Sequence, residues 1–221
     1  MEISTGGISM DNKTIIISCA GMGTRLGIGM TKALIDIDGK PLIIRQLEQL
    51  KDCSDVRIVV GYQAEKVMEI VKAYRDDIMF CFNYDYKISG TAASFSKGLV
   101  GAREWVVAFD GDLLVKPSDL KAFLKLNEEC VGGCDPTTDN PVLMEINENG
   151  EIIEFSREHG QLEWTGLALL KRDRLIPADK HVYMMIEPLM PIKVMHIDTK
   201  EVDTINDYKN AVEWVKNGYK Q

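Results

Sequence analysis

The chain has 221 residues, of which 45% are hydrophobic, and a formal net charge of -8. This length and apolar content are enough to bury the core of one domain. The negative charge argues against a general nucleic-acid or membrane-surface binder, because an excess of Lys and Arg holds such partners. No apolar run approaches the ~20 residues of a membrane span. No signal peptide is recognised before the first strand, so a cytoplasmic protein is expected.

The cysteines lie singly along the chain, at Cys19, Cys53, Cys81, Cys130 and Cys134. Their odd number and the lack of a Cys-x-x-Cys pair argue against a disulfide framework and against a zinc site. A single domain is expected over 14–221, and residues 1–13 are expected to be an N-terminal extension.

Short apolar runs alternate with helical patterns through the first half of the chain. Strands are predicted at 14–18, 56–60, 78–82 and 105–109, and helices at 41–51, 63–74, 92–100 and 117–126. This order predicts right-handed crossovers and a Rossmann-like α/β fold, a three-layer sandwich with a mostly parallel central sheet. Ligands of such sheets bind at the carboxyl ends of the strands.

The second half changes character. Strands are predicted at 130–133, 142–147, 151–156, 163–170 and 192–197, with a helix at 183–190 and a last helix that ends at Val215. The dipeptide Asn149-Gly150 between two alternating runs predicts a hairpin. A small β-rich insertion is therefore expected in this half.

The loop after the first strand is the first candidate site. Gly21 and Gly23 allow the backbone to bend and to approach a ligand, so that amide N–H groups point at phosphate oxygens. Arg25 adds a forked cation and Lys32 a point charge, a combination that suits a polyphosphate. Leu26 stands where a dinucleotide fingerprint has its third glycine, and no Gly-Lys-Ser/Thr follows to make a P-loop.

The whole string Gly-x-Gly-x-Arg, six residues, Lys-Ala-Leu and then Asp-Gly-Lys-Pro-Leu at 38–42 resembles a family signature. It is that of the nucleotidyltransferases that join an NTP to a phosphorylated acceptor, among them sugar-1-phosphate nucleotidyltransferases and phosphocholine cytidylyltransferases. The resemblance implies their nucleotide-diphospho-sugar transferase fold, which is GT-A-like. Thr31 stands where the family usually has proline, so the approach of the following lysine is less rigidly set.

In that family the loop wraps the triphosphate. The resemblance implies that Arg25 and Lys32 are the catalytic cations on the phosphates. It also implies that the loop residues bind the nucleotide, namely Ala20, Gly21, Met22, Gly23 and Thr24.

Two further turns on the same sheet edge resemble the segments that hold the base in this family. One contains Gln63, after the second strand, and the other contains Gly90 and Thr91, after the third. The resemblance implies that these residues read a pyrimidine through directional hydrogen bonds. Capping of the following helix by Ser89 and Thr91 is an equally good interpretation of the second turn.

Asp110-Gly111-Asp112 ends the strand at 105–109. Two carboxylates at the end of a buried strand are costly unless a cation neutralises them, and oxygen ligands on an open loop suit Mg²⁺. The family has a metal ligand at this position, so the resemblance implies Asp112 as a ligand and Asp110 as its support.

The segment 201–208 resembles the closing Asp-Thr-x-x-Asp-Tyr segment of the family, which implies Asp203 as the second metal ligand. The alternative is purely structural. Thr204 or Asn206 caps the last helix, and Asp207 stabilises the N-terminal end of its dipole.

The strand at 163–170 resembles the family strand that lines the acceptor site. The resemblance implies Glu163, Trp164 and Thr165 as acceptor-binding residues, and Glu187 is a further candidate. A core position for Trp164 and a solvated Glu187 are the alternatives. An aromatic cage for a cationic headgroup is a separate hypothesis, built from Tyr84, Tyr86, Trp164 and Tyr183.

Together these residues predict a magnesium-dependent transfer of NMP to a small phosphorylated or phosphonate acceptor, with release of pyrophosphate. The compact spacing from Arg25 to Lys32 resembles that of small-acceptor cytidylyltransferases, which favours CTP. The alternatives are a sugar-1-phosphate nucleotidyltransferase using another NTP, a GT-A glycosyltransferase and a non-catalytic nucleotide-binding regulator. Neither nucleic acid nor a membrane is an expected partner, and a homo-oligomer is left open.

Overall fold

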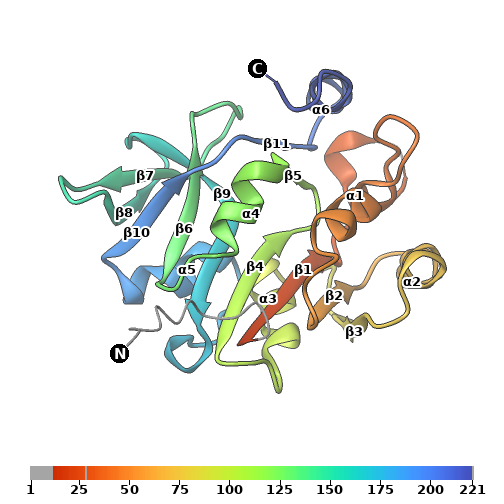
Figure 1. Cartoon of the computed structure of the whole chain (residues 1–221), viewed down its shortest axis with the longest axis horizontal. Coiled ribbons are helices and arrows are strands. Elements are labelled where there is room, and N and C mark those ends of the chain that lie inside the picture. The colour runs from red at the N-terminus through yellow and green to blue at the C-terminus, as the bar shows by residue number, and fades with distance from the viewer. Residues whose placement is uncertain (1–11, 28, 221) are drawn as a thin grey trace, which may run out of the picture.

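The structure is a computed structural model that describes residues 12–27 and 29–220. Figure 1 shows its elements in chain order. The strands are β1 Lys13–Cys19, β2 Val56–Val60, β3 Met79–Phe82, β4 Trp105–Asp110, β5 Leu113–Val115, β6 Cys130–Cys134, β7 Leu143–Ile146, β8 Glu151–Ser156, β9 Leu162–Lys171, β10 Ile192–His196 and β11 Thr199–Glu201. The α-helices are α1 Leu42–Gln49, α2 Ala64–Tyr74, α3 Thr91–Leu99, α4 Pro117–Phe123, α5 Val182–Ile186 and α6 Ile205–Lys216.

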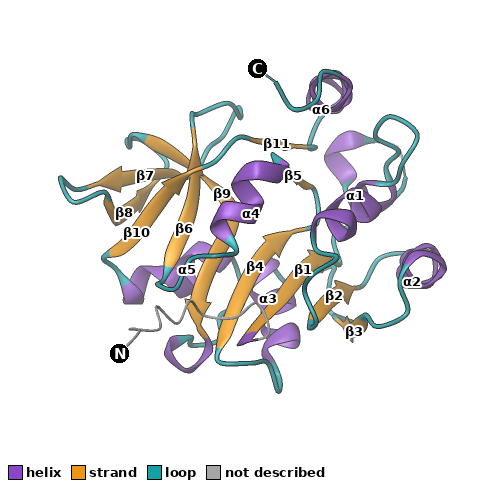
Figure 2. Cartoon of the chain, viewed as in Figure 1, coloured by secondary structure: helices purple, strands orange, loops and turns teal. Residues whose placement is uncertain are grey.

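The N-terminal half is a parallel sheet in the order β3-β2-β1-β4. The strands β1, β2 and β4 are buried on both faces, which is why they are largely apolar runs, whereas the edge strand β3 is partly exposed. On β1, Ile17 packs in one cluster with Leu47 of α1, and Ile16 packs in another with Phe95 of α3. The helices α2 and α4 join the first cluster and α5 joins the second. Figure 2 shows these helices around the strands, a Rossmann-like α/β arrangement as predicted.

The other half of the sheet corrects the expectation of a mostly parallel sheet. The strand β9 runs antiparallel to both β4 and β6. The strands β9, β6, β10, β8 and β7 follow one another, and β7 pairs back with β9, so they close into a ring at the left of Figure 1. The predicted hairpin at Asn149-Gly150 is confirmed, because β7 and β8 pair antiparallel across it.

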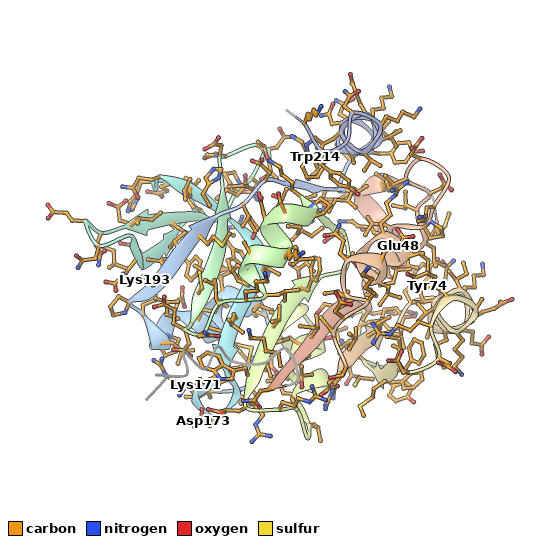
Figure 3. The ribbon with its side chains drawn as sticks, viewed as in Figure 1. Glu48, Tyr74, Lys171, Asp173, Lys193 and Trp214 are labelled. Carbon is orange, nitrogen blue, oxygen red and sulfur yellow. The ribbon has the colours of Figure 1, made fainter. Side chains whose placement is uncertain are left out.

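The strands β5 and β11 form a small antiparallel sheet that the sequence did not predict. With α6 it lies beyond the carboxyl ends of β1 and β4 (Figure 1). One hydrophobic cluster contains Leu26 of the loop after β1, Leu114 of β5, Val202 just after β11, and Trp214 of α6. Trp214, labelled in Figure 3, lies on the side of α6 that faces β11. This cluster brings the segment before α6 against the glycine loop.

Lys13, which we expected in the N-terminal extension, is the first residue of β1 and is 1% exposed. Its ammonium Nζ donates to the carbonyl oxygens of Leu124 at 2.6 Å and Leu126 at 2.8 Å, just after α4. The boundary of the expected extension is therefore wrong at this residue, and residues 1–11 lie outside the described part. All the cysteines are free, as predicted. No helix within the described residues is long and apolar enough to cross a membrane.

Candidate active site

The glycine loop leaves β1 and forms a single 3-10 turn at Thr24–Leu26. Gly23 has φ +60, and a Cβ there would lie 3.0 Å from Cγ of Lys32 and 3.2 Å from the carbonyl oxygen of Met30. Only glycine fits both the left-handed conformation and the close approach. The aliphatic stem of Lys32 therefore lies directly against the loop. Gly21 has neither a positive φ nor a neighbour near its Cβ position, so the structure gives no such reason for it.

The two predicted cations meet the two predicted metal ligands. Nζ of Lys32 lies 2.6 Å from Oδ2 of Asp112 and also bonds Oδ1 of Asp203. The guanidinium of Arg25 lies 2.6 Å from Oδ2 of Asp203. Asp203 is 8% exposed, whereas the side chain of Arg25 is 72% exposed. Four residues from distant segments thus form one ionic network.

A third carboxylate, Glu201, belongs to the same cluster. One oxygen of each of Asp112, Glu201 and Asp203 lies within 4.8 Å of the others. Burial raises the pKa of Glu201 to about 7, with a further rise from the charge of Asp112. Such a group of hard oxygen ligands, partly shielded from water, fits Mg²⁺. Sequence reasoning missed Glu201, the last residue of the short strand β11, which lies two residues before Asp203.

Asp110 does not join this carboxylate cluster. Burial, together with the charges of Asp112 and Glu201, raises the pKa of Asp110 well above its ordinary value. The side chain packs against Gly166, where φ is +83 and a Cβ would overlap the carboxylate. The backbone carbonyl oxygen of Asp110 accepts a hydrogen bond from Nε2 of Gln46 at 2.8 Å. The placement agrees with a supporting position behind Asp112.

The three predicted base-reading residues already have partners in the chain. The amide of Gly90 donates to the carbonyl of Asp179 at 2.8 Å, and Oγ1 of Thr91 accepts from the amide of Val182 at 3.4 Å. Both polar atoms of the Gln63 side chain bond the segment before Lys32. The capping alternative is wrong, because Gly90 is the N-cap of α3 and no side chain caps it. Base recognition by these residues remains a prediction.

The structure separates the four acceptor candidates. Oε2 of Glu163 accepts from the amides of Thr137 at 2.8 Å and Thr138 at 3.2 Å, so Glu163 holds the loop after β6. Thr165 is buried, and its hydroxyl donates to the carbonyl of Gly132 at 2.9 Å. Because side chains alternate along β9, Trp164 points to the opposite face from both.

Trp164 is half-buried and packs against the core cluster of α3 and α5, so acceptor binding by this side chain remains a prediction. Glu187 is exposed in the 3-10 turn Glu187–Leu189 that leads to β10. The structure therefore does not bring Glu187 into contact with the other acceptor candidates.

The hypothetical aromatic cage does not form within the described residues. Tyr84 stacks on Phe82 with a centroid distance of 5.7 Å. Tyr86 instead approaches Tyr62 at 6.2 Å. Trp164 and Tyr183 share a neighbour, Phe155, at 5.9 and 5.4 Å. The four rings thus divide among three separate groups.

A cavity of about 390 Å³ is lined in part by Thr199 and Lys200, which precede Glu201 on β11. Its walls come from the loop after β6, from β10 and β11, and from α6, and include Thr137, His196, Thr199 and Trp214. Thr199 and Glu201 lie on the same face of β11, because side chains alternate along a strand. The neighbouring Lys200 also lines the cavity, so the cavity reaches the strand that carries one carboxylate of the cluster.

The glycine loop and its two cations face carboxylates at the carboxyl edge of an α/β sheet, which is the arrangement expected of a nucleotidyltransferase. The comparison with known families agrees: the MobA-like NTP transferase domain matches residues 15–164, and the chain belongs to this family.

Among curated proteins, the bifunctional protein GlmU of Sulfurovum sp. (strain NBC37-1) is 28% identical over 147 residues. The match covers 64% of this chain and 34% of that protein, so the chain spans only part of the length of such relatives. Among solved structures, the CTP:phosphocholine cytidylyltransferase LicC from Streptococcus pneumoniae has a TM-score of 0.76 at 20% identity, covering 92% of this chain and 99% of that one. The inositol-1-phosphate CTP transferase from T. maritima has a TM-score of 0.75 at 18% identity, covering 96% and 99%. At these identities the two structures share the fold.

Proposed function

We propose that this chain is a magnesium-dependent nucleotidyltransferase. It transfers a nucleoside monophosphate, with CMP from CTP favoured, to a phosphorylated or phosphonate small molecule and releases pyrophosphate. The observation that carries the proposal is the meeting of Arg25 and Lys32 with Asp112 and Asp203. Cations for a triphosphate and carboxylates for a metal are thus within one side-chain length of each other.

In the proposed reaction an oxygen of the acceptor phosphate attacks the α-phosphorus in line, and the bond to the pyrophosphate breaks. The acceptor oxygen is already an anion, so the residues must orient the reactants and stabilise charge rather than remove a proton. Asp112, Glu201 and Asp203 would hold Mg²⁺, which supplies charge neutralisation on the phosphates when bound.

Arg25 and Lys32 stabilise the charge that develops on the departing pyrophosphate. In this structure both cations bond to carboxylates. The long, exposed side chain of Arg25 is free to turn toward a phosphate, and Lys32 lies beside the loop amides. The proposal therefore gives these two residues the catalytic positions.

We place the body of the acceptor in the cavity beside Glu201. Support comes from Thr199 and Lys200, which line the cavity and belong to the same short strand as Glu201. Glu163 contributes indirectly, because it holds the backbone of Thr137 in the cavity wall. The compact spacing from Arg25 to Lys32, and two structural relatives whose names specify CTP, support CTP as the donor.

The test is pyrophosphate release with Mg²⁺, each of five nucleoside triphosphates, and a panel of phosphocholine, phosphonates and sugar 1-phosphates. We expect release that requires both an acceptor and one triphosphate, with CTP the best. Release with another triphosphate and a sugar 1-phosphate would move the proposal to the alternative nucleotidyltransferase. Nucleotide binding without release across the panel would contradict it.

A further inference from the structure

The turn at 61–63 contacts both ends of the glycine loop. At the beginning of the loop, the amide of Tyr62 donates to the carbonyl of Ala20 at 3.0 Å. At its far end, the hydroxyl of Tyr62 donates to the carbonyl of Gly29 at 3.2 Å. The turn that follows the neighbouring strand β2 therefore connects the two ends of the glycine loop, at Ala20 and at Gly29.

The side chain of Gln63 adds two hydrogen bonds at the exit. Its Oε1 accepts from the amide of Thr31 at 3.1 Å, and its Nε2 donates to the carbonyl of Gly29 at 3.1 Å. These two hydrogen bonds hold the side-chain amide in one orientation, with its oxygen and its nitrogen both turned to the backbone of the loop exit. Thr31 is 2% exposed and directly precedes Lys32.

The backbone of Gln63 is also unusual. Its φ is +52, in the left-handed region that residues other than glycine rarely adopt. Glycine would adopt the same conformation without a steric penalty. A strained residue at a functional site calls for a reason, and at Gln63 the reason is the pair of hydrogen bonds that only its side chain makes.

We propose that Gln63 is a positioning residue for the transfer reaction and not a reader of the base. It fixes the backbone of 29–31, and through it aims Lys32 at the phosphates of the triphosphate. The inference rests on the proposed function, because it assumes that Lys32 binds a triphosphate. It also replaces the role that the family resemblance implied for Gln63.

Thr31 gives a way to test the mechanism of positioning. Its φ is -63, the value that proline imposes, and its ψ is 139. Proline has no amide to donate to Gln63, yet it restricts the backbone by itself. If Gln63 acts by holding this segment, a proline at position 31 makes the glutamine dispensable.

The first experiment measures binding of inorganic tripolyphosphate, which has no base, by titration calorimetry. We expect Gln63→Gly to bind it about tenfold more weakly than the unaltered chain. The affinities for CTP, UTP, GTP, ATP and dTTP should fall by the same factor, so that their order does not change. The matched control is Asp38→Gly, which relieves a positive φ of 53 at an exposed residue and should leave binding unchanged.

Unchanged tripolyphosphate affinity in Gln63→Gly, with a loss for CTP alone or a new order among the triphosphates, would identify Gln63 as a base reader and overturn the inference. If the unaltered chain binds neither tripolyphosphate nor any triphosphate, the proposed function itself fails. These two failures give different results. Thermal unfolding of each variant shows that a loss of affinity is not a loss of fold.

The second experiment is rescue. Thr31→Pro combined with Gln63→Gly should bind tripolyphosphate within about threefold of the unaltered chain, whereas Gln63→Gly alone should not. A folded double variant as weak as Gln63→Gly would show that Gln63 does not act through this backbone segment.

Discussion

Lys32 and Arg25 form ion pairs with Asp112 and Asp203, two of the carboxylates that would hold the metal ion in the proposed reaction. Nζ of Lys32 contacts both Asp112 and Asp203, and Arg25 contacts Asp203. Buried charges are tolerated when they are paired and hydrogen-bonded, and in this network each charged group has a partner of opposite charge. Substrate phosphates and Mg²⁺ would provide alternative partners for each.

At this scale we predict that Asp112→Asn and Asp203→Asn each lower turnover by about a hundredfold or more, because each removes negative charge from the metal ligands. The fold should persist, since the amide keeps the size and polarity of the side chain. Steady-state rates and thermal unfolding check the two statements. The control is Asp77→Asn, an exposed carboxylate paired with Arg75 away from the site, and it should retain full turnover. A folded Asp203→Asn with normal magnesium-dependent turnover would refute the metal assignment.

The lowered pKa of Asp55 predicts how the stability of the fold depends on pH. Burial tends to raise the pKa of Asp55, but hydrogen bonds from Arg57 and Thr14 and the charges of Arg57 and Arg103 outweigh it and lower the pKa. A carboxylate with a folded pKa below its unfolded value of about 3.9 stabilises the fold above that pH. This contribution is lost as the pH falls through the folded pKa.

We therefore expect Asp55→Asn to lower the free energy of unfolding by about 1–2 kcal/mol at neutral pH. The difference in unfolding free energy between this variant and the unaltered chain should shrink as the pH falls below the pKa of the carboxyl group in the unfolded chain. Urea unfolding over a pH series measures it. A difference that stays constant down to the acid limit would mean that the charge of Asp55 contributes nothing.

Among the elements, α6 and the pair β5–β11 matter most to the site. The amide of Thr204 donates to Oδ2 of Asp207 at 2.8 Å, and Oγ1 of Thr204 accepts from the amide of Asp207 at 3.2 Å. This capping box confirms the predicted structural role of the segment and fixes the start of α6. Asp203 directly precedes the cap, so structural and metal roles occupy neighbouring residues.

Thr204→Ala should destabilise the chain by about 1 kcal/mol, because the amide of Asp207 loses its acceptor and Oδ2 of Asp207 loses the hydroxyl donor of Thr204. Differential scanning calorimetry measures this as a lower Tm. Ser118→Ala, in the first turn of α4 where no side-chain cap exists, is the matched control and should have little effect. Equal Tm values for the two variants would contradict the capping role.

The loop after β6 gives a prediction about the acceptor. Glu163→Gln weakens the charge-assisted bonds that hold the amides of Thr137 and Thr138. We expect the KM for the acceptor to rise about fivefold, with little change in the KM for the triphosphate. Glu158→Gln, at an exposed position in the β8–β9 connection, should leave both constants unchanged. A rise in the KM for the triphosphate alone would place Glu163 on the nucleotide side.

Over the whole molecule, the sequence predicted best what depends on local pattern. The apolar runs of β1 and β2 and the Asn149-Gly150 turn each have a local cause, namely burial on two faces and a hairpin dipeptide. The antiparallel return of β9 and the closure of β7 onto it depend on pairings between distant segments, which no local pattern encodes. The same holds for the boundary at Lys13, whose partners follow α4.

The candidate site follows the same division. Arg25, Lys32, Asp112 and Asp203 came from strings whose residue types reveal their chemistry, and the structure brings them together. Glu201 was missed because β11 is a strand of only three residues with polar character. Acceptor binding by Glu163, Trp164 and Thr165 remains a prediction, and side-chain alternation along β9 places Trp164 on the opposite face from the other two.

In the proposed reaction the α-phosphate and its nucleoside move from the triphosphate to the acceptor. The most direct measurement follows CTP labelled at the α-phosphorus or at the γ-phosphorus, with Mg²⁺ and the acceptor found in the panel. The account predicts that the α label appears in the acceptor product and the γ label in pyrophosphate, and that Asp203→Asn abolishes both. Transfer of the γ label to the acceptor, or no transfer of either, would contradict it.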